Sequence, residues 1–304
     1  MKQTSSSLGH LCATITVLIW GTTFISTKVL LRSLSPVEIL FARFLIGFAT
    51  LALLRPRRLK LRNWREELYF AAAGLMGVTF YYLLENIALT LTTASNVGVV
   101  SSSAPFFTGI LAGWFLKAEK PGAQFYVGFA AAIAGIALIS FNGNYNLQLN
   151  PLGDLLALLA AATWAVYSIL IRKIGGWGYD TIQATKRMFF YGLLFMVPAL
   201  FFMDFRIGID RYLDPVNLGN ILFLGLGASA ACFVTWNMAV GLLGAVKTSV
   251  YIYVVPVITV AASVLILGEP LTPLLVVGAA LALTGSWLSE TRMFDKRKKT
   301  SPEA

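Results

Sequence analysis

The sequence predicts an all-α polytopic membrane protein of ten transmembrane helices, arranged as two five-helix repeats of inverted topology. Of the 304 residues, 57% are apolar and only 12% are charged, whereas soluble globular proteins carry about 25% charged residues. The apolar residues are gathered in ten blocks, each about as long as a helix that crosses the hydrocarbon core. The two halves of the chain also share residue types in the same order, which indicates an internal repeat.

Each apolar block predicts one membrane-crossing helix. The blocks cover residues 9–30, 36–54, 68–90, 94–117, 122–141, 152–172, 181–203, 218–240, 245–267 and 272–290. Backbone groups in lipid need partners within the chain, so spanning segments are helices or strands of a closed barrel. Uninterrupted apolar runs exclude the alternating pattern of barrel strands. The first block exceeds the apolar core of a signal peptide, and we expect it to remain as the first helix.

Basic residues are concentrated in every second connection between the blocks. One side carries the basic run 55–65, Lys117, Lys120, Arg172, Lys173 and the tail 291–304. The other side carries Arg32, Arg206 and Arg211. The positive-inside rule therefore predicts a protein of the cell (cytoplasmic) membrane with both termini cytoplasmic. The run 55–65 also fits anionic lipid headgroups, but the topology signal alone is the favoured interpretation.

Three registers relate the first half of the chain to the second. The matched pairs are Trp20 with Trp164, Lys28 with Arg172, Arg43 with Arg187, Asn86 with Asn237, Ala88 with Ala239, Pro105 with Pro256, Glu119 with Glu269, Gly128 with Gly278, and Gly135 with Gly285. They divide the chain into a first repeat (1–142), a linker (143–150), a second repeat (151–290) and a basic tail (291–304). An odd number of helices per repeat inverts the second copy, as in secondary transporters with a midplane site.

Four short motifs make the chain resemble a known family. Residues 19–24 read IWGTTF, 42–44 read ARF, 104–105 read AP and 267–272 read LGEPLT. They resemble the ten-helix EamA-type branch of the drug/metabolite transporter superfamily, over residues 9–290. The resemblance implies a secondary transporter that needs no cofactor. Bacterial members of this type export amino acids, some of them aromatic, and other small metabolites, so the motifs leave the substrate open.

The helix midpoints give the first candidates for a central site. They fall near Trp20, Pro105, Trp164 and Pro256. Proline removes a backbone N–H, so matched prolines predict interrupted helices around a cavity; a kink that only shapes packing is the alternative. Hydroxyl groups precede both prolines, on Ser101, Tyr251 and Tyr253. We expect the cavity to be lined by the first, third, fourth, sixth, eighth and ninth helices.

Charged residues inside the blocks usually face the interior of a helix bundle. Arg43 and Arg187 are expected to flank the cavity and to hold a carboxylate, with snorkelling to the interface as the alternative. Glu85 is the one carboxylate well inside a block. Burial favours its protonated form, which would suit proton coupling. A lone carboxylate in its charged form would instead suit an organic cation. A salt bridge between Glu85 and Arg43 is the favoured interpretation, because a paired buried charge costs less than an isolated one.

Aromatic and polar side chains complete the candidate site. The substrate-binding candidates are Trp20, Thr23, Tyr81, Tyr82, Glu85, Asn86, Ser101, Trp164, Tyr167, Trp236, Asn237, Tyr251 and Tyr253. Rings with few charges suit an uncharged, zwitterionic or aromatic solute, and cation–π contact would also suit a quaternary ammonium. The alternative for Asn86 and Asn237 is that they form hydrogen bonds between neighbouring helices and do not bind substrate. Phe24 is assigned to packing.

Two further sets of residues are assigned structural roles. Small-residue contacts between close helices are expected at Gly74, Gly77, Gly109, Gly113, Gly128, Gly135, Gly278 and Gly285. Glu119 and Glu269 stand just before the predicted fifth and tenth helices. An acid at that position complements the positive end of a helix, so capping is expected for both.

These features predict a transporter that exports a small metabolite, such as an amino acid, by alternating access. An exporter of cationic drugs or quaternary ammonium compounds is the alternative. No enzyme motif is present, and Cys12, Cys232 and the single His10 form no metal-ligand pattern. The net charge of +10 is assigned to membrane orientation rather than to nucleic acid. The expected partners are the substrate and the lipid bilayer, and we expect a monomer.

Overall fold

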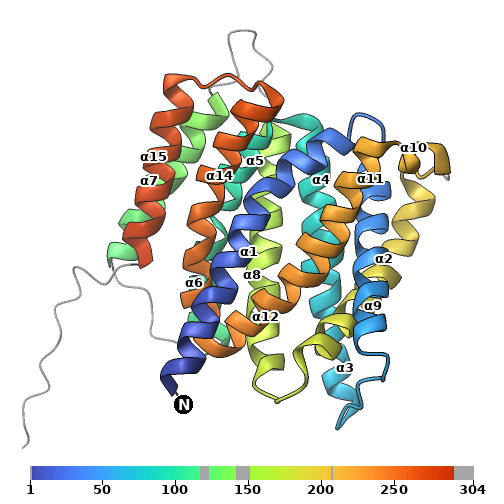
Figure 1. Cartoon of the computed structure of the whole chain (residues 1–304). Helices are drawn as coiled ribbons and strands as arrows, with labels where there is room; N and C mark the ends of the chain where they lie inside the picture. Colours follow the sequence, from blue (N-terminus) through green and yellow to red (C-terminus); the bar gives the residue numbers. More distant parts are fainter. Residues whose placement is uncertain (1, 117–122, 142–150, 207, 291–304) are drawn as a thin grey trace, which may run out of the picture.

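The computed structural model describes residues 2–116, 123–141, 151–206 and 208–290, and throughout these ranges it contains helices and no strand. The first half of the bundle holds α1 (Lys2–Leu30), α2 (Pro36–Leu54), α3 (Trp64–Gly74), η1 (Leu75–Phe80), α4 (Tyr81–Leu91), α5 (Ala94–Ser101), α6 (Ala104–Phe115) and α7 (Ala123–Phe141). Segments α3, η1 and α4 are continuous, and α5 and α6 together make one further crossing. Figure 1 shows the segments side by side as one bundle.

The second half repeats this order with three additional short segments, α10, η4 and η5. It holds α8 (Pro151–Gly175), α9 (Thr181–Phe202), α10 (Ile209–Leu213), α11 (Pro215–Leu222), η3 (Phe223–Ala231), α12 (Cys232–Leu243), α13 (Ala245–Ser249), η4 (Val250–Val254), α14 (Val255–Ala262), η5 (Ser263–Leu267) and α15 (Pro273–Glu290). The short helix α10 lies in a connection for which no helix was expected.

The structure confirms a polytopic all-α membrane protein. Among the described residues, eight helical segments are long and apolar enough to cross a membrane, and residues 124–135 and 273–285 are shorter apolar helices. These ten segments coincide with the ten predicted blocks, although the first, third and eighth begin earlier, at Ser6, Trp64 and Pro215. The division into two repeats stays a prediction.

Short polar sequences set the helix starts. At α2, the Ser35 hydroxyl accepts from the Glu38 N–H at 3.4 Å, and the Glu38 carboxylate accepts from the Ser35 N–H at 2.7 Å. This reciprocal pair satisfies two of the backbone donors that a helix leaves free at its first turn. Asn63, Thr93 and Asp180 cap α3, α5 and α9 in the same way with one side-chain acceptor each.

Matching spans in the two halves are interrupted in matching ways. The third and eighth spans each contain a π-helical stretch, η1 and η3. The fourth span breaks at Ser102 and Ser103 before Pro105 opens α6, and the ninth passes through the 3-10 turn η4 before Pro256 opens α14. The matched prolines Pro105 and Pro256 predict the interruptions in the fourth and ninth spans. The π turns were not expected, because no residue type specifies them.

Glycines bring α7 and α15 into close contact, side by side at one edge of the bundle in Figure 1. A Cβ atom on Gly135 would lie 2.4 Å from the Ala282 nitrogen, and one on Gly285 would lie 2.5 Å from the Ala132 nitrogen. Gly74 makes a similar contact with the α9 backbone at Met188. The small-residue interpretation is therefore confirmed for these positions, where only glycine permits such backbone approach.

Candidate functional site

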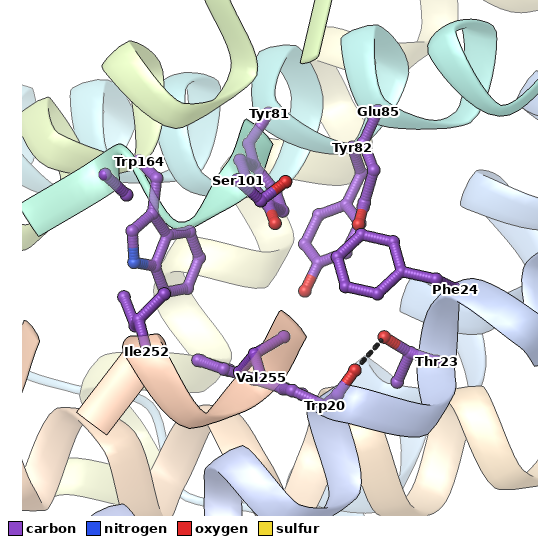
Figure 2. Close-up of a pocket in the computed structure, with 11 residues that line it drawn as sticks. Trp20, Thr23, Phe24, Tyr81, Tyr82, Glu85, Ser101, Trp164, Ile252 and Val255 are labelled. Atoms are coloured by element: carbon purple, nitrogen blue, oxygen red, sulfur yellow. Dashed lines mark hydrogen bonds between the residues drawn. The ribbon is translucent and has the colours of Figure 1, made fainter. Parts of the chain in front are cut away.

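A small cavity lies at the centre of the bundle, between α1, α4, α5, α6, α8, η4 and α14. Its described lining consists of Trp20, Thr23, Phe24, Tyr81, Tyr82, Glu85, Ser101, Ala104, Trp164, Ile252 and Val255. Figure 2 shows Tyr82 and Glu85 reaching in from one wall, opposite Phe24 and Thr23 on α1. The free volume is about 30 Å³, which holds only a water molecule or two. Pockets for small ligands measure several hundred Å³, so this conformation is closed.

Two tryptophans at matching places in the two halves meet at this cavity. The Trp20 and Trp164 rings pack edge to face with their centroids 5.1 Å apart. The Trp20 indole N–H donates to the Ala228 carbonyl at 3.0 Å, which holds that ring in place. The Trp164 indole N–H and the Ser101 hydroxyl are buried and have no hydrogen-bond partner in the described part of the chain. Both groups are therefore buried donors that the surrounding described residues leave unused.

Glu85 is the one charged residue among the described side chains that line the cavity. Its side chain is buried, with 4% exposed, and the Tyr81 hydroxyl lies within hydrogen-bonding reach. The predicted ion pair with Arg43 is wrong: the four ion pairs among described residues do not include it. The Arg43 guanidinium instead lies 4.3 Å from the centre of the Tyr82 ring and donates to the Ser229 hydroxyl at 3.0 Å.

Several predicted site residues lie away from the cavity. The Asn86 amide donates to the Pro36 carbonyl at 3.0 Å. Asn237 accepts from the Tyr167 hydroxyl at 2.7 Å and donates to Thr185 at 3.0 Å. Both asparagines therefore bond helix to helix, the alternative that the sequence left open.

The remaining aromatic candidates also stay outside the lining. Trp236 packs behind Trp20 with ring centroids 5.0 Å apart, so the eighth span supports the cavity rather than lining it. The Tyr251 hydroxyl lies 2.5 Å from the His10 ring nitrogen Nδ1. Tyr253 lines a separate surface groove beside Trp287.

The cavity also contains residues that the sequence did not single out. Phe24, Ala104, Ile252 and Val255 line it. Phe24 stands one helical turn after Trp20, and residues four apart share a helix face. That spacing could have placed Phe24 in the site rather than in packing.

One end of the bundle, the α10 end (31–35, 92–93, 203–206, 208–214 and 268–272), is closed by contacts between the two halves. The Glu269 carboxylate accepts from the backbone N–H groups of Ala94 at 2.9 Å and Ser95 at 3.2 Å, and from the Ser95 hydroxyl at 2.5 Å. Glu269 therefore caps α5 of the other half and not the helix that follows it, which corrects the expectation. Lys28 donates to the carbonyls of Leu89 and Thr92 beside it. Glu119 lies outside the described residues.

A buried carboxylate at the same end is paired with an arginine. Arg211 donates two hydrogen bonds to Glu38, at 2.6 and 3.0 Å, and Glu38 has 1% exposed surface. The hydrogen bond to Glu38 raises the pKa of Arg211, so the guanidinium stays charged. This pair ties the α10 connection to the start of α2.

The opposite end, the α3 end (55–63, 176–180 and 244), holds Arg187. Its guanidinium forms two hydrogen bonds with Glu67, one of them at 2.8 Å, and donates to the Leu59 carbonyl at 2.9 Å. The expectation that Arg187 flanks the central cavity is therefore wrong. Its helix, α9, reaches the α3 end within two turns, so the side chain joins that end of the bundle.

The chain is similar to a known transporter family and to transporters of other organisms. The model of the EamA-like transporter family matches residues 7–141 and again residues 151–291. An uncharacterised transporter of Archaeoglobus fulgidus is 26% identical over 94% of this chain and 99% of its own length. The Bacillus subtilis transporter YvbV is 27% identical over 96% of this chain and 94% of its own.

Two further similarities concern a named substrate and the fold. A probable terminal-alkyne amino-acid exporter of Streptantibioticus cattleyicolor is 27% identical over 94% of this chain and 95% of its own. A protein crystal structure matches with a TM-score of 0.65 at 20% identity, over 94% of this chain and 97% of the other, which supports the fold alone. The relatives are named as transporters and not as enzymes. This chain belongs to the EamA-like transporter family and is a multi-pass membrane transporter.

Proposed function

We propose that the chain exports amino acids, including aromatic ones, across the cytoplasmic membrane by alternating access, with both termini cytoplasmic. The observation that carries the proposal is the composition of the central cavity. Glu85 is the one charged residue among the described side chains that line the cavity, and its carboxylate suits the ammonium group of an amino acid. The free N–H of Trp164 and the free hydroxyl of Ser101 are donors that suit the carboxylate. The surrounding rings suit an apolar or aromatic side chain.

Alternating access is supported by the closed cavity and by where its closing contacts lie. A space of about 30 Å³ cannot hold an amino acid, so the helices must separate before substrate binds. The Glu269 contacts join α5 of the first five spans to the connection before α15 of the last five. Movement of one half against the other would break these contacts together, as expected for inverted repeats around a central site.

Export of organic cations is the second candidate, and it is favoured by one observation. A single carboxylate among aromatic rings also binds quaternary ammonium groups through charge and cation–π contact. The two candidates differ in their need for donors, because an organic cation has no carboxylate to bind. Ser101 and Trp164 should matter for an amino acid and not for a cation.

Efflux from proteoliposomes tests both candidates. Vesicles are loaded with a mixture of amino acids and a quaternary ammonium dye, and the loss of each is followed by mass spectrometry, with and without a pH gradient. We expect saturable loss of amino acids, abolished by Glu85→Gln and weakened about tenfold by Ser101→Ala, the loss of one hydrogen bond to a charged group. Loss of the dye alone, unaffected by Ser101→Ala, would favour the second candidate and refute the first.

A further inference from the structure

A groove at the α3 end lies between α2, α9 and the connection that precedes α3. It has a volume of about 370 Å³, far larger than the central cavity. Arg58, Lys186 and Arg187 contribute three positive charges to its lining, against one carboxylate from Glu67. The groove therefore carries an excess of positive charge and is large enough for a ligand in this conformation.

The positive charges are not equally engaged by the protein. Arg187 is neutralised by Glu67 through two hydrogen bonds. Lys186 donates to the carbonyls of Arg55 and Arg57, which fixes the ammonium group but leaves its charge unpaired. Arg58 is exposed and forms no hydrogen bond or ion pair with any residue that the structure describes. The groove thus presents two unneutralised cations, one fixed and one free.

The other side of the groove is apolar and continues along the bundle surface. Phe48 and Phe190 line it, with ring centroids 6.4 Å apart. Phe190 is 49% exposed, and Leu194, one turn further along α9, is 50% exposed. In a membrane-spanning helix such side chains meet the hydrocarbon core. The groove therefore combines a cationic mouth at the end of the bundle with an apolar track that leads along α9 into the bilayer.

We propose that this groove binds one anionic phospholipid. Its phosphate lies at Arg58 and Lys186, and one acyl chain lies along Phe48 and Phe190. Basic pockets between transmembrane helices on the cytoplasmic side have the charge and position that anionic headgroups require. A lipid there contacts α2 and α9 at once, one helix from each half of the bundle. The proposal rests on the proposed orientation, with the α3 end cytoplasmic, and does not depend on the identity of the transported substrate.

The test measures lipid binding to the purified full chain in detergent by native mass spectrometry. The probes are phosphatidylglycerol, phosphatidylcholine with the same acyl chains, and soluble glycerol phosphate. We expect preferential retention of phosphatidylglycerol. Arg58→Gln should weaken it about fivefold, the effect of one basic residue near an anionic lipid. Arg57→Gln is the matched control, because it removes the same charge from the same connection but does not line the groove, and it should change retention less than twofold.

A second variant separates a lipid site from a site for free phosphate. Phe190→Ala removes an exposed ring, so the fold should persist, as checked by gel filtration and circular dichroism. It should weaken retention of phosphatidylglycerol and leave glycerol phosphate binding unchanged. Glycerol phosphate binding as tight as phosphatidylglycerol would overturn the proposal in favour of a soluble anion. Equal retention of the two lipids, or equal effects of Arg58→Gln and Arg57→Gln, would overturn it as well.

Discussion

Replacing Glu269 with glutamine should open the α10 end of the bundle. The carboxylate accepts three hydrogen bonds from the first turn of α5, with Lys28 close by. A glutamine side chain offers a single acceptor oxygen and no charge. It would therefore lose at least one charge-assisted hydrogen bond, worth about 1.5–3 kcal/mol. That loss shifts the balance between closed and open forms by roughly ten- to a hundredfold towards the open form.

The reactivity of a cysteine placed in the cavity reports this shift. Ser101→Cys provides the thiol, in a background where Cys12 and Cys232 are replaced by alanine. We expect the rate of N-ethylmaleimide labelling to rise about tenfold or more when Glu269→Gln is added, since labelling needs the open form. Asp210→Asn is the control, because it removes an exposed acid at the same end. An unchanged rate, or the same rise with the control, would refute the idea that Glu269 holds this end closed.

Three further predictions concern stability and are checked by thermal unfolding in detergent. Gly285→Ala should destabilise the chain by about 1–3 kcal/mol through overpacking against α7, whereas Gly219→Ala, with open space around its Cβ position, should leave stability unchanged or raise it. Arg211→Gln should cost about 1–3 kcal/mol, because the buried Glu38 carboxylate loses its ion-pair partner and keeps only the backbone donors of Ser35 and Arg206. Arg206→Gln, whose ion pair is exposed, should cost under about 1 kcal/mol. Asn237→Ala should cost about 1–3 kcal/mol, because it leaves the buried Tyr167 hydroxyl without its acceptor and removes one of the two hydrogen bonds of Thr185. Equal unfolding temperatures within either matched pair, or an unchanged one for Asn237→Ala, would contradict the reasoning.

The helices could be predicted from the sequence because the bilayer imposes their length. A run of about 20 apolar residues has few alternatives to a membrane-crossing helix. The observed helix ends differ from the predicted ones where polar residues belong to the helix. The third span, for example, begins at Trp64 and not at residue 68, because backbone hydrogen bonds continue past the apolar run. The π turns were missed, since they arise from packing between helices and leave no mark in local composition.

Part of the central cavity could be predicted from the internal repeat of the sequence. Trp20 and Trp164 share a place in the two halves, and the structure brings them together, as a repeat around a central site would. Glu85 was singled out as a buried charge, but the partner predicted for it, Arg43, was wrong, because the sequence does not show that Arg43 contacts Tyr82 and Ser229 instead. Asn237 matches Asn86 in the chain, yet both turn to neighbouring helices. The direction in which a side chain points depends on how its helix is rotated about its own axis, and composition does not determine that rotation.

The wide turn η1 affects how the third span can change in length. A π turn holds about one residue more than an α turn, and η1 directly precedes Tyr81, Tyr82 and Glu85. A deletion within α4 would rotate the residues after it by about 100° relative to those before it. A deletion between residues 75 and 80 would instead leave an ordinary α turn and keep the three side chains directed at the cavity. Single-residue deletions among homologues should therefore collect in η1 and be rare in α4.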